Sequence, residues 1–400
     1  MRFWKRWGCS AALLVALVPM TVQAASISGR SSTVLEWFDN ADEETAVGAY
    51  QYVNLSARDL PGGLDFQGYG RLAEDLKDEV DIDSRLYYAY LDKQKLIGNL
   101  DARLGRQFVS TTAGASLLDG LKLDYTGLGD FALSLYGGGD VSYYDGYDSK
   151  DWLAGVEGAY TPIQNLKASL AYLQQWEDGD LAKELIGFEL DYDLQQALNL
   201  YGEVQYSWLT DEVTYFLTGV NYHRDRNWSL RGEYLYSLPV FSATSIYSVF
   251  AVSEYQEASL EALYRLGKGL NTFARLSNEF YAEYDDARVI ELGIEKLRTG
   301  KYSGYLVGVY RDDEEGQGLY GAKVRVAYRF HEKFEAGLGA HIDVLERRLD
   351  DDDETTSSRI WVDANTHLTR TISLQAKVES VESDLWSEYF RGRLRLNISF

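Results

Sequence analysis

The sequence predicts an all-β protein, a transmembrane antiparallel up-and-down β-barrel of about 22 strands, with roughly 16 to 20 strands as the other count that the pattern allows. Three observations predict this fold. Apolar and polar residues alternate in stretches of about ten residues. The composition, with 31 Tyr, 36 Gly and 4 Pro, is typical of many strands joined by turns. Two chemically different kinds of connection take turns along the chain.

Composition and charge exclude several classes of protein. The chain has 400 residues, a net charge of −23, one Cys and four His. One cysteine excludes a disulfide scaffold and a cysteine-rich metal site, and so few histidines argue against a histidine-rich metal centre. The acidity argues against a nucleic-acid partner, which requires a basic face. We therefore expect no metal, no cofactor and no nucleic acid, while the 46% hydrophobic content argues against disorder.

The first 24 residues are typical of a secretory signal peptide. A positively charged start extends to Arg6, residues 11–18 form a short apolar run, and a small-residue cleavage site ends at Ala24. The run is shorter than the roughly 20 residues of a membrane-spanning helix. We expect the barrel to occupy residues 25–400. Because its first strand begins within a few residues of the cleavage site, we expect no plug domain.

Period-two alternation continues to the end of the chain, and no later segment is a continuous apolar run of transmembrane length. It is clearest at residues 152–160, 198–207, 334–343, 372–379 and 394–400. A soluble sandwich also alternates. However, these stretches are longer than the roughly five to six residues that are usual in soluble strands. Aromatic residues also cluster at their ends, as the interfacial girdles of membrane barrels do.

The connections between the stretches fall into two groups that interleave in sequence. One group is acidic, at residues 39–44, 74–79, 140–148, 177–180, 283–286, 312–315 and 350–354. The other is short and neutral or basic, at residues 59–63, 93–95, 126–130, 161–164, 223–227, 266–269, 297–301 and 331–333. A meander with longer loops outside and tight turns on the periplasmic side predicts this order. Residues 247–265 can form one long strand or two after an outer loop near residues 238–245; an even total, with both termini on the periplasmic side, favours one strand.

The last strand carries a resemblance to a known family. The chain ends at Phe400, and Leu394, Leu396 and Ile398 precede it at alternate positions. This ending resembles the C-terminal assembly signal of bacterial outer-membrane barrels. Together with the signal peptide, it makes the chain similar to the porin superfamily over essentially its whole mature length. The resemblance implies a location in the bacterial outer membrane, with lipid, lipopolysaccharide and the barrel-assembly machinery as partners.

A second match is shorter. Residues 103–107 (RLGRQ), followed by residues 118–121 (LDGL), resemble a strand–loop–strand region of substrate-selective porins, including alginate-export-type channels. The loop between them, residues 108–117, is shorter than in that family and lacks the Trp and the Arg expected there. The resemblance therefore does not extend to alginate transport.

If leucine, valine and isoleucine face lipid, the alternate positions line the lumen. On that register the inward basic residues are Arg30, Arg71, Arg103, Lys323, Arg325, Arg329, Arg359, Lys377, Arg391, Arg393 and Arg395. The inward acidic residues, roughly opposite, are Glu157, Glu189, Asp191 and Glu203. Such facing walls of guanidinium and carboxylate groups select small polar solutes by charge and size. The alternative is that these residues are simply solvated and offset one another.

Two classes of function remain open. The first is a channel for passive diffusion of small polar or ionic solutes. The second is a structural sheath around a partner protein, such as a multihaem cytochrome in an electron conduit. The chain has no Cys-x-x-Cys-His, so any haem would belong to that partner. His341 and Asp343 share an inward face, but the other histidines fall at predicted turns, and we expect no enzyme. The solute and a homo-oligomeric state are left open.

Overall fold

The computed structural model describes residues 25–39, 44–142, 147–194, 197–238, 254–282, 285–313, 318–346, 354–384 and 386–400. The expected signal peptide, residues 1–24, lies outside them, and so does most of the expected outer loop near residues 238–245. The described residues form strands and turns and no helix, so they contain no plug domain. None of them forms a helix with the length and apolarity needed to cross a bilayer.

Long strands follow one another along the whole described chain. They are β1 (Ser26–Asp39), β2 (Thr45–Leu60), β3 (Leu64–Asp75), β4 (Arg85–Ile97), β5 (Leu100–Thr111), β6 (Gly114–Leu128), β7 (Phe131–Val141), β8 (Ser149–Ile163), β9 (Leu166–Glu177), β10 (Asp180–Leu194), β11 (Leu198–Ser207), β12 (Glu212–Arg224), β13 (Trp228–Ser237), β14 (Tyr255–Gly267), β15 (Leu270–Tyr281), β16 (Ala287–Lys296), β17 (Tyr302–Asp313), β18 (Leu319–His331), β19 (Phe334–Glu346), β20 (Glu354–His367), β21 (Ile372–Ser383) and β22 (Trp386–Ser399).

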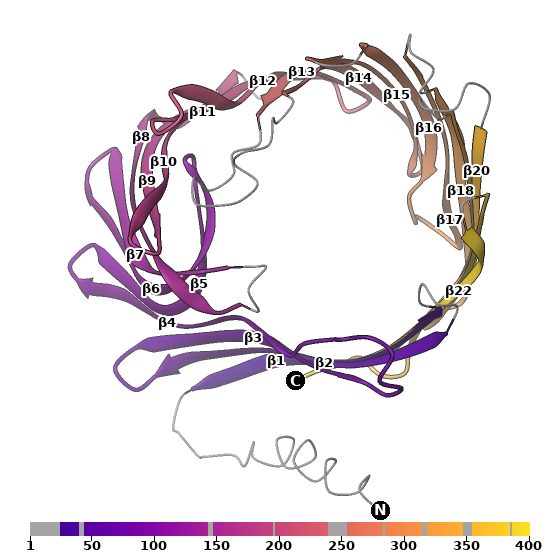
Figure 1. The fold of residues 1–400 in the computed structure, drawn as a ribbon, viewed down its shortest axis with the longest axis horizontal. Coiled ribbons are helices and arrows are strands. Elements are labelled where there is room, and N and C mark those ends of the chain that lie inside the picture. Colours follow the sequence, from indigo (N-terminus) through magenta and orange to yellow (C-terminus); the bar gives the residue numbers. More distant parts are fainter. Residues whose placement is uncertain are drawn as a thin grey trace, which may run out of the picture.

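The strands form one closed 22-stranded sheet in which each strand pairs antiparallel with its neighbours in sequence. The ring closes where β1 pairs with β22, from Arg30 opposite Ser399 to Phe38 opposite Arg391. Figure 1 shows the strands arranged as a ring. Closure removes the sheet edges, so the backbone groups of the wall are paired without water, as a bilayer requires. The predicted all-β barrel and the predicted count of 22 strands are confirmed.

The two ends of the barrel differ as the connections predict. Both termini of the sheet lie at one end, here called the terminal end, because Arg30 pairs with Ser399. The acidic connections are at the other end, the loop end, and the short connections are at the terminal end. One turn is displaced: the connection expected at residues 93–95 lies at residues 98–99. Of the expected long strand 247–265, the described part belongs to one strand, β14.

The outer face is apolar. Leu338, Ile360 and Val362 point outward and are 58%, 59% and 55% exposed. Apolar surface costs roughly 25 cal/mol per Å² in water, and a soluble protein rarely exposes a continuous apolar patch beyond a few hundred Å². An apolar band that continues around the whole barrel is therefore a surface for lipid.

Aromatic side chains border this band at both ends. At the loop end, the rings of Trp152 and Trp176 contact each other across β8 and β9, with centroids 5.9 Å apart. At the terminal end, Trp228 and Tyr264 contact each other across β13 and β14 at 4.5 Å. Amphipathic rings at these two levels are typical of the girdles that hold a barrel at the membrane–water interfaces.

Candidate functional site

The inner face of the barrel carries the charged residues. Because Val362, Val378 and Leu394 point outward, their sequence neighbours point into the lumen. The structure places the predicted basic residues there: Arg30 on β1, Arg71 on β3, Arg103 on β5, Lys323, Arg325 and Arg329 on β18, Arg359 on β20, Lys377 on β21, and Arg391, Arg393 and Arg395 on β22. Six of these basic residues lie on the adjacent strands β20, β21, β22 and β1. We call this group the basic column; it consists of Arg30, Arg359, Lys377, Arg391, Arg393 and Arg395.

Some of the inner basic residues are neutralised by carboxylates. Arg325 on β18 forms a bidentate pair with Asp363 on β20, with Nε–Oδ1 and Nη2–Oδ2 distances of 2.9 and 2.5 Å. Arg103 pairs with Asp92 at 3.2 Å. Two parallel hydrogen bonds fix a guanidinium in one orientation. Arg325 is therefore a rigid part of the wall, and its charge is largely offset.

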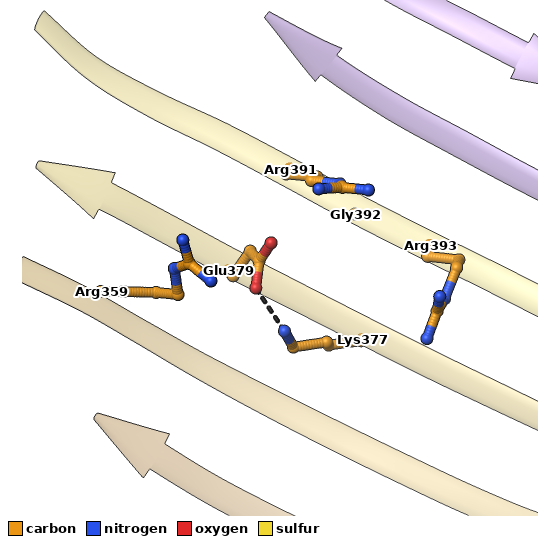
Figure 2. A pocket seen from close by; sticks show the side chains of 6 residues that line it. All are labelled: Arg359, Lys377, Glu379, Arg391, Gly392 and Arg393. Carbon is orange, nitrogen blue, oxygen red and sulfur yellow. Dashed lines mark hydrogen bonds and ion pairs between the residues drawn. The ribbon is translucent and has the colours of Figure 1, made fainter. Parts of the chain in front are cut away.

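The basic column is much less neutralised. A recess of about 210 Å³ lies over β20, β21 and β22. The residues that line it, drawn in Figure 2, are Arg359, Lys377, Glu379, Arg391, Gly392 and Arg393. Among the described residues that line it, Glu379 is the one carboxylate, and it pairs with Lys377. Within the described chain, the three guanidinium groups of this recess form no ion pair. Like charges on neighbouring strands destabilise a sheet unless something screens them, so the recess favours water and anions.

A second recess of about 280 Å³ continues the basic surface to the terminal end. The described residues that line it include Arg30, His367, Arg370 and Arg395 and no carboxylate. Arg395 donates from Nε to the side-chain amide oxygen Oδ1 of Asn397 at 3.0 Å. Because β22 contributes to both recesses, positive charge extends along this wall from one recess to the next.

The predicted acidic residues lie on strands on the far side of the ring. Glu157 is on β8, Glu189 and Asp191 are on β10, and Glu203 is on β11, facing Glu189 across the strand pair. Figure 1 shows these strands across the ring from β22. Lys167 offsets Glu189, with an Nζ–Oε2 distance of 3.4 Å. The two walls thus carry opposite charge.

Residues 108–117, expected to form a loop, instead form a β-hairpin that leaves the wall. The β4–β5 pairing ends at Ala89 opposite Arg106, and the β6–β7 pairing ends at Leu118 opposite Asp140. Beyond those points β5 and β6 pair only with each other, as far as Thr111 opposite Gly114. Figure 1 shows this β5–β6 hairpin inside the ring, beside the strands that follow it.

The hairpin docks on the inner surface of β7 to β10. At its tip, the Thr112 hydroxyl donates to the Gly187 carbonyl of β10 at 3.1 Å. A Cβ at position 187 would lie 1.9 Å from the Thr112 carbonyl oxygen, so only glycine permits this approach. An apolar cluster joins the two surfaces, made of Val109, Ala113, Leu118, Tyr136, Leu153, Ala171 and Leu173. The hairpin is therefore packed against the wall and narrows the lumen on its acidic side.

The RLGRQ and LDGL segments form the bend at the base of the hairpin. Gly105 pairs with Gly120, and a Cβ on Gly105 would lie 2.4 Å from the Ala89 carbonyl oxygen. Arg106 forms a bidentate pair with Asp119, with distances of 2.8 and 2.7 Å. Gln107 is fully buried and donates to the Gly120 carbonyl at 3.1 Å. The two segments that carry the sequence resemblance thus form the bend that turns the hairpin into the lumen.

The predicted assembly signal lies on the outer face of β22. Leu394, Ile398 and Phe400 are exposed to the lipid side, Leu396 shares their register, and the backbone of Phe400 pairs with Gly29. Its part in assembly stays a prediction. The docking of the hairpin was not among the features predicted from the sequence. A signal was present: Leu153, Ala171 and Leu173 occupy inner positions where a water-filled barrel needs polar residues.

Comparison with known proteins locates the fold. No family model and no curated protein sequence matches the chain. Among solved structures, OpdQ of Pseudomonas aeruginosa is similar with a TM-score of 0.50 and 10% identity, over 95% of this chain and 99% of that one. OpdF of the same organism has a TM-score of 0.49 and 11% identity, over 94% and 98%. The translocation pore of the P pilus usher PapC has 0.48 and 9%, over 94% and 99%.

At these sequence identities, the similarity to these structures shows a shared fold. A closed barrel with a lipid-facing outer surface is also the architecture that resides in the bacterial outer membrane. The chain therefore has the fold of outer-membrane porins, as its C-terminal strand suggested, and its apolar outer face fits the bacterial outer membrane.

Proposed function

We propose that the protein is an outer-membrane channel for passive diffusion of small polar and ionic solutes, and that the basic column draws anions through it. The observation that carries the proposal is the recess of Figure 2, where Arg359, Arg391 and Arg393 face the lumen without ion pairs in the described chain. Guanidinium groups arranged in this way lower the energy of an anion along the wall, and the water around them keeps its binding weak enough for release.

The docked hairpin supports a channel over a sheath. A sheath that holds a folded partner protein needs a wide lumen, whereas this hairpin covers the inner surface of β7 to β10. A narrowed passage between an acidic and a basic wall brings small solutes close to both. The alternative, a barrel around a multihaem cytochrome, requires the hairpin to be displaced by the partner.

Planar-bilayer recording of the purified protein tests the proposal. In a gradient of KCl at about 0.1 M, where the screening length is about 10 Å, the reversal potential should show a preference for chloride. The triple variant Arg391→Ser, Arg393→Ser and Arg395→Ser should move the reversal potential toward the cation side. Arg231→Ser is the matched control, because Arg231 also faces the lumen but is paired with Glu233 at 2.6 Å.

The possible results separate the two functions. An unchanged reversal potential in the triple variant would remove the role of the basic column. Purified wild-type protein that inserts into the bilayer without discrete open steps would overturn the channel and favour the sheath.

A further inference from the structure

A group of tyrosines lines the wall next to the basic column and has no part in the proposed charge selection. The group, here called the tyrosine track, consists of Tyr50 and Tyr52 on β2, Tyr69 on β3, and Tyr87, Tyr88 and Tyr90 on β4. Val53 on β2, Leu72 on β3, and Leu86 and Leu91 on β4 are exposed on the lipid side. Because Tyr87 is an extra residue between Leu86 and Tyr88, all six tyrosines lie on the inner face. They therefore do not belong to the interfacial girdles, which are on the outer face.

The track descends the wall diagonally. Tyr69 pairs with Asn54, which is two residues beyond Tyr52 on β2. Tyr90 pairs with Gln67, which itself pairs with Ser56, two residues further along β2 toward the terminal end. From Tyr50 to the level of Tyr90 is six residues along β2, which is roughly 20 Å at the rise of a strand. The surface is thus long enough for more than one ring of a solute.

The rings form a continuous surface. Successive centroids are 6.3 Å apart for Tyr50–Tyr52 and for Tyr52–Tyr69, and 4.9 Å apart for Tyr69–Tyr87, with interplanar angles of 30°, 18° and 20°. A β-bulge between Tyr69 and Gly70 sets the register so that Tyr87 and Tyr88 both contact Tyr69. All six side chains of the track are half-buried, so part of each ring faces the lumen.

Polar groups border this aromatic surface. The Asn54 amide donates to the Tyr88 hydroxyl at 3.0 Å, and the Tyr90 hydroxyl donates to Gln67 at 2.8 Å. Arg71 lies 5.3 Å from the ring centre of Tyr50, and Arg103 lies 4.4 Å from that of Tyr90. Hydrogen-bonding groups around an aromatic platform suit a solute that has both an apolar face and many hydroxyl groups.

The tyrosine track adjoins the basic column, because β2 pairs with β1, which carries Arg30, and β22 lies beyond β1. Tyr50 pairs with Val34 of β1, and Val34 pairs with Arg395 of β22. At the usual spacing of strands, the backbones of Tyr50 and Arg395 are roughly 10 Å apart. A ring on the track therefore lies beside the path of the anions and not in it.

We propose that the tyrosine track is a guiding surface for oligosaccharides, whose rings pack against successive tyrosines as the chain of sugars passes along the wall. This inference rests on the proposed channel function. The C–H face of a pyranose packs on an aromatic ring, while the hydroxyls at its edge bond to the polar border. A single small anion would contact only a small part of a surface of this length.

The test is block of the ion current by neutral sugars, which do not engage the basic column through charge. Glucose, maltose and maltotriose are added to the channel of the full-length mature protein in a planar bilayer. Each further ring should tighten the apparent affinity about two- to tenfold, because one aromatic contact is worth that factor. Gluconate, an open-chain sugar acid, and benzoate, a flat acid without hydroxyls, are the comparison solutes.

Variants link the block to the track. Tyr52→Leu with Tyr69→Leu should weaken the block by maltotriose about tenfold and preserve the conductance in KCl, and Tyr52→Phe with Tyr69→Phe should retain most of the block. Tyr215→Leu is the control, because Tyr215 is a half-buried inner tyrosine on the far wall. Heat-dependent mobility in gel electrophoresis shows that each variant is folded.

Three outcomes would overturn the inference. These are an affinity that does not rise with the number of rings, a block that survives the double leucine variant, and a block by benzoate or gluconate stronger than that by maltotriose. In each of them the channel still conducts, so the failure is distinct from failure of the proposed function, which would be a protein without conductance.

Discussion

Loosening the β5–β6 hairpin is expected to expose a wider state of the pore. Val109 is 3% exposed because the hairpin is docked, and burial of a valine is worth about 1.5 to 3 kcal/mol. The Thr112–Gly187 hydrogen bond adds about 1 kcal/mol. Val109→Ser with Thr112→Val removes both contributions; Thr112→Val keeps the size of the side chain, and Val109→Ser makes it both smaller and polar. A loss of about 3 kcal/mol raises the ratio of undocked to docked hairpin more than about a hundredfold.

Single-channel recording measures this ratio. The docked hairpin should give the main conductance level, and the undocked hairpin a larger one that is rare in the wild type. Replacing residues 108–117 by a two-residue turn defines the larger level. In the double variant the occupancy of that level should rise by about two orders of magnitude. Ser110→Ala is the control, since Ser110 is an exposed residue of the same hairpin.

Two results would refute this reasoning. If the protein without the hairpin has the conductance of the wild type, the hairpin does not limit the pore. If that protein conducts more but the double variant does not, contacts other than those of Val109 and Thr112 hold the hairpin in place.

Two further predictions concern the wall. Deleting Phe400 removes the backbone pairing with Gly29 where the barrel closes, and it removes the end of the expected assembly signal. We expect less folded protein in the outer membrane, measured by heat-modifiable mobility in gel electrophoresis. A normal amount of folded protein would contradict the assembly signal. Ile360→Arg places a charge on the lipid face at mid-height and should cost about 2 to 4 kcal/mol in reversible urea unfolding into detergent or lipid, whereas Ile27→Arg, near the barrel end, should cost about 1 kcal/mol or less. Equal costs at the two positions would argue against the bilayer position inferred here.

The wall could be predicted from the sequence because its physics is local. Lipid on one side and water on the other impose a period of two, which Leu394 to Ile398 display directly. The tight turns and acidic connections then fix where each strand ends. Little long-range information is needed for a meander, since each strand pairs with its neighbour in sequence.

The interior could not be predicted as well, because it depends on packing between distant strands. Alternation in β5 and β6 is the same whether the hairpin continues the wall or folds inward. Contacts far along the chain distinguish the two, such as that of Thr112 with Gly187, 75 positions away, and the apolar cluster of Val109 with Leu153 and Leu173. The tyrosine track was equally hidden: Tyr50 and Tyr52 show the inward register, but a bulge in β4 decides that Tyr87 and Tyr88 lie beside Tyr69.

Gly29 and Phe400 are joined by two backbone hydrogen bonds of 2.9 and 3.1 Å. Because the two ends of the sheet are adjacent, the order of the strands around the ring does not depend on where the polypeptide starts. A short linker between the two ends, with new ends cut in the turn at residues 61–63, would give a circular permutant that keeps each neighbour relation of the sheet. In such a chain β2 becomes the last strand to be made, and the present seam becomes an ordinary hairpin.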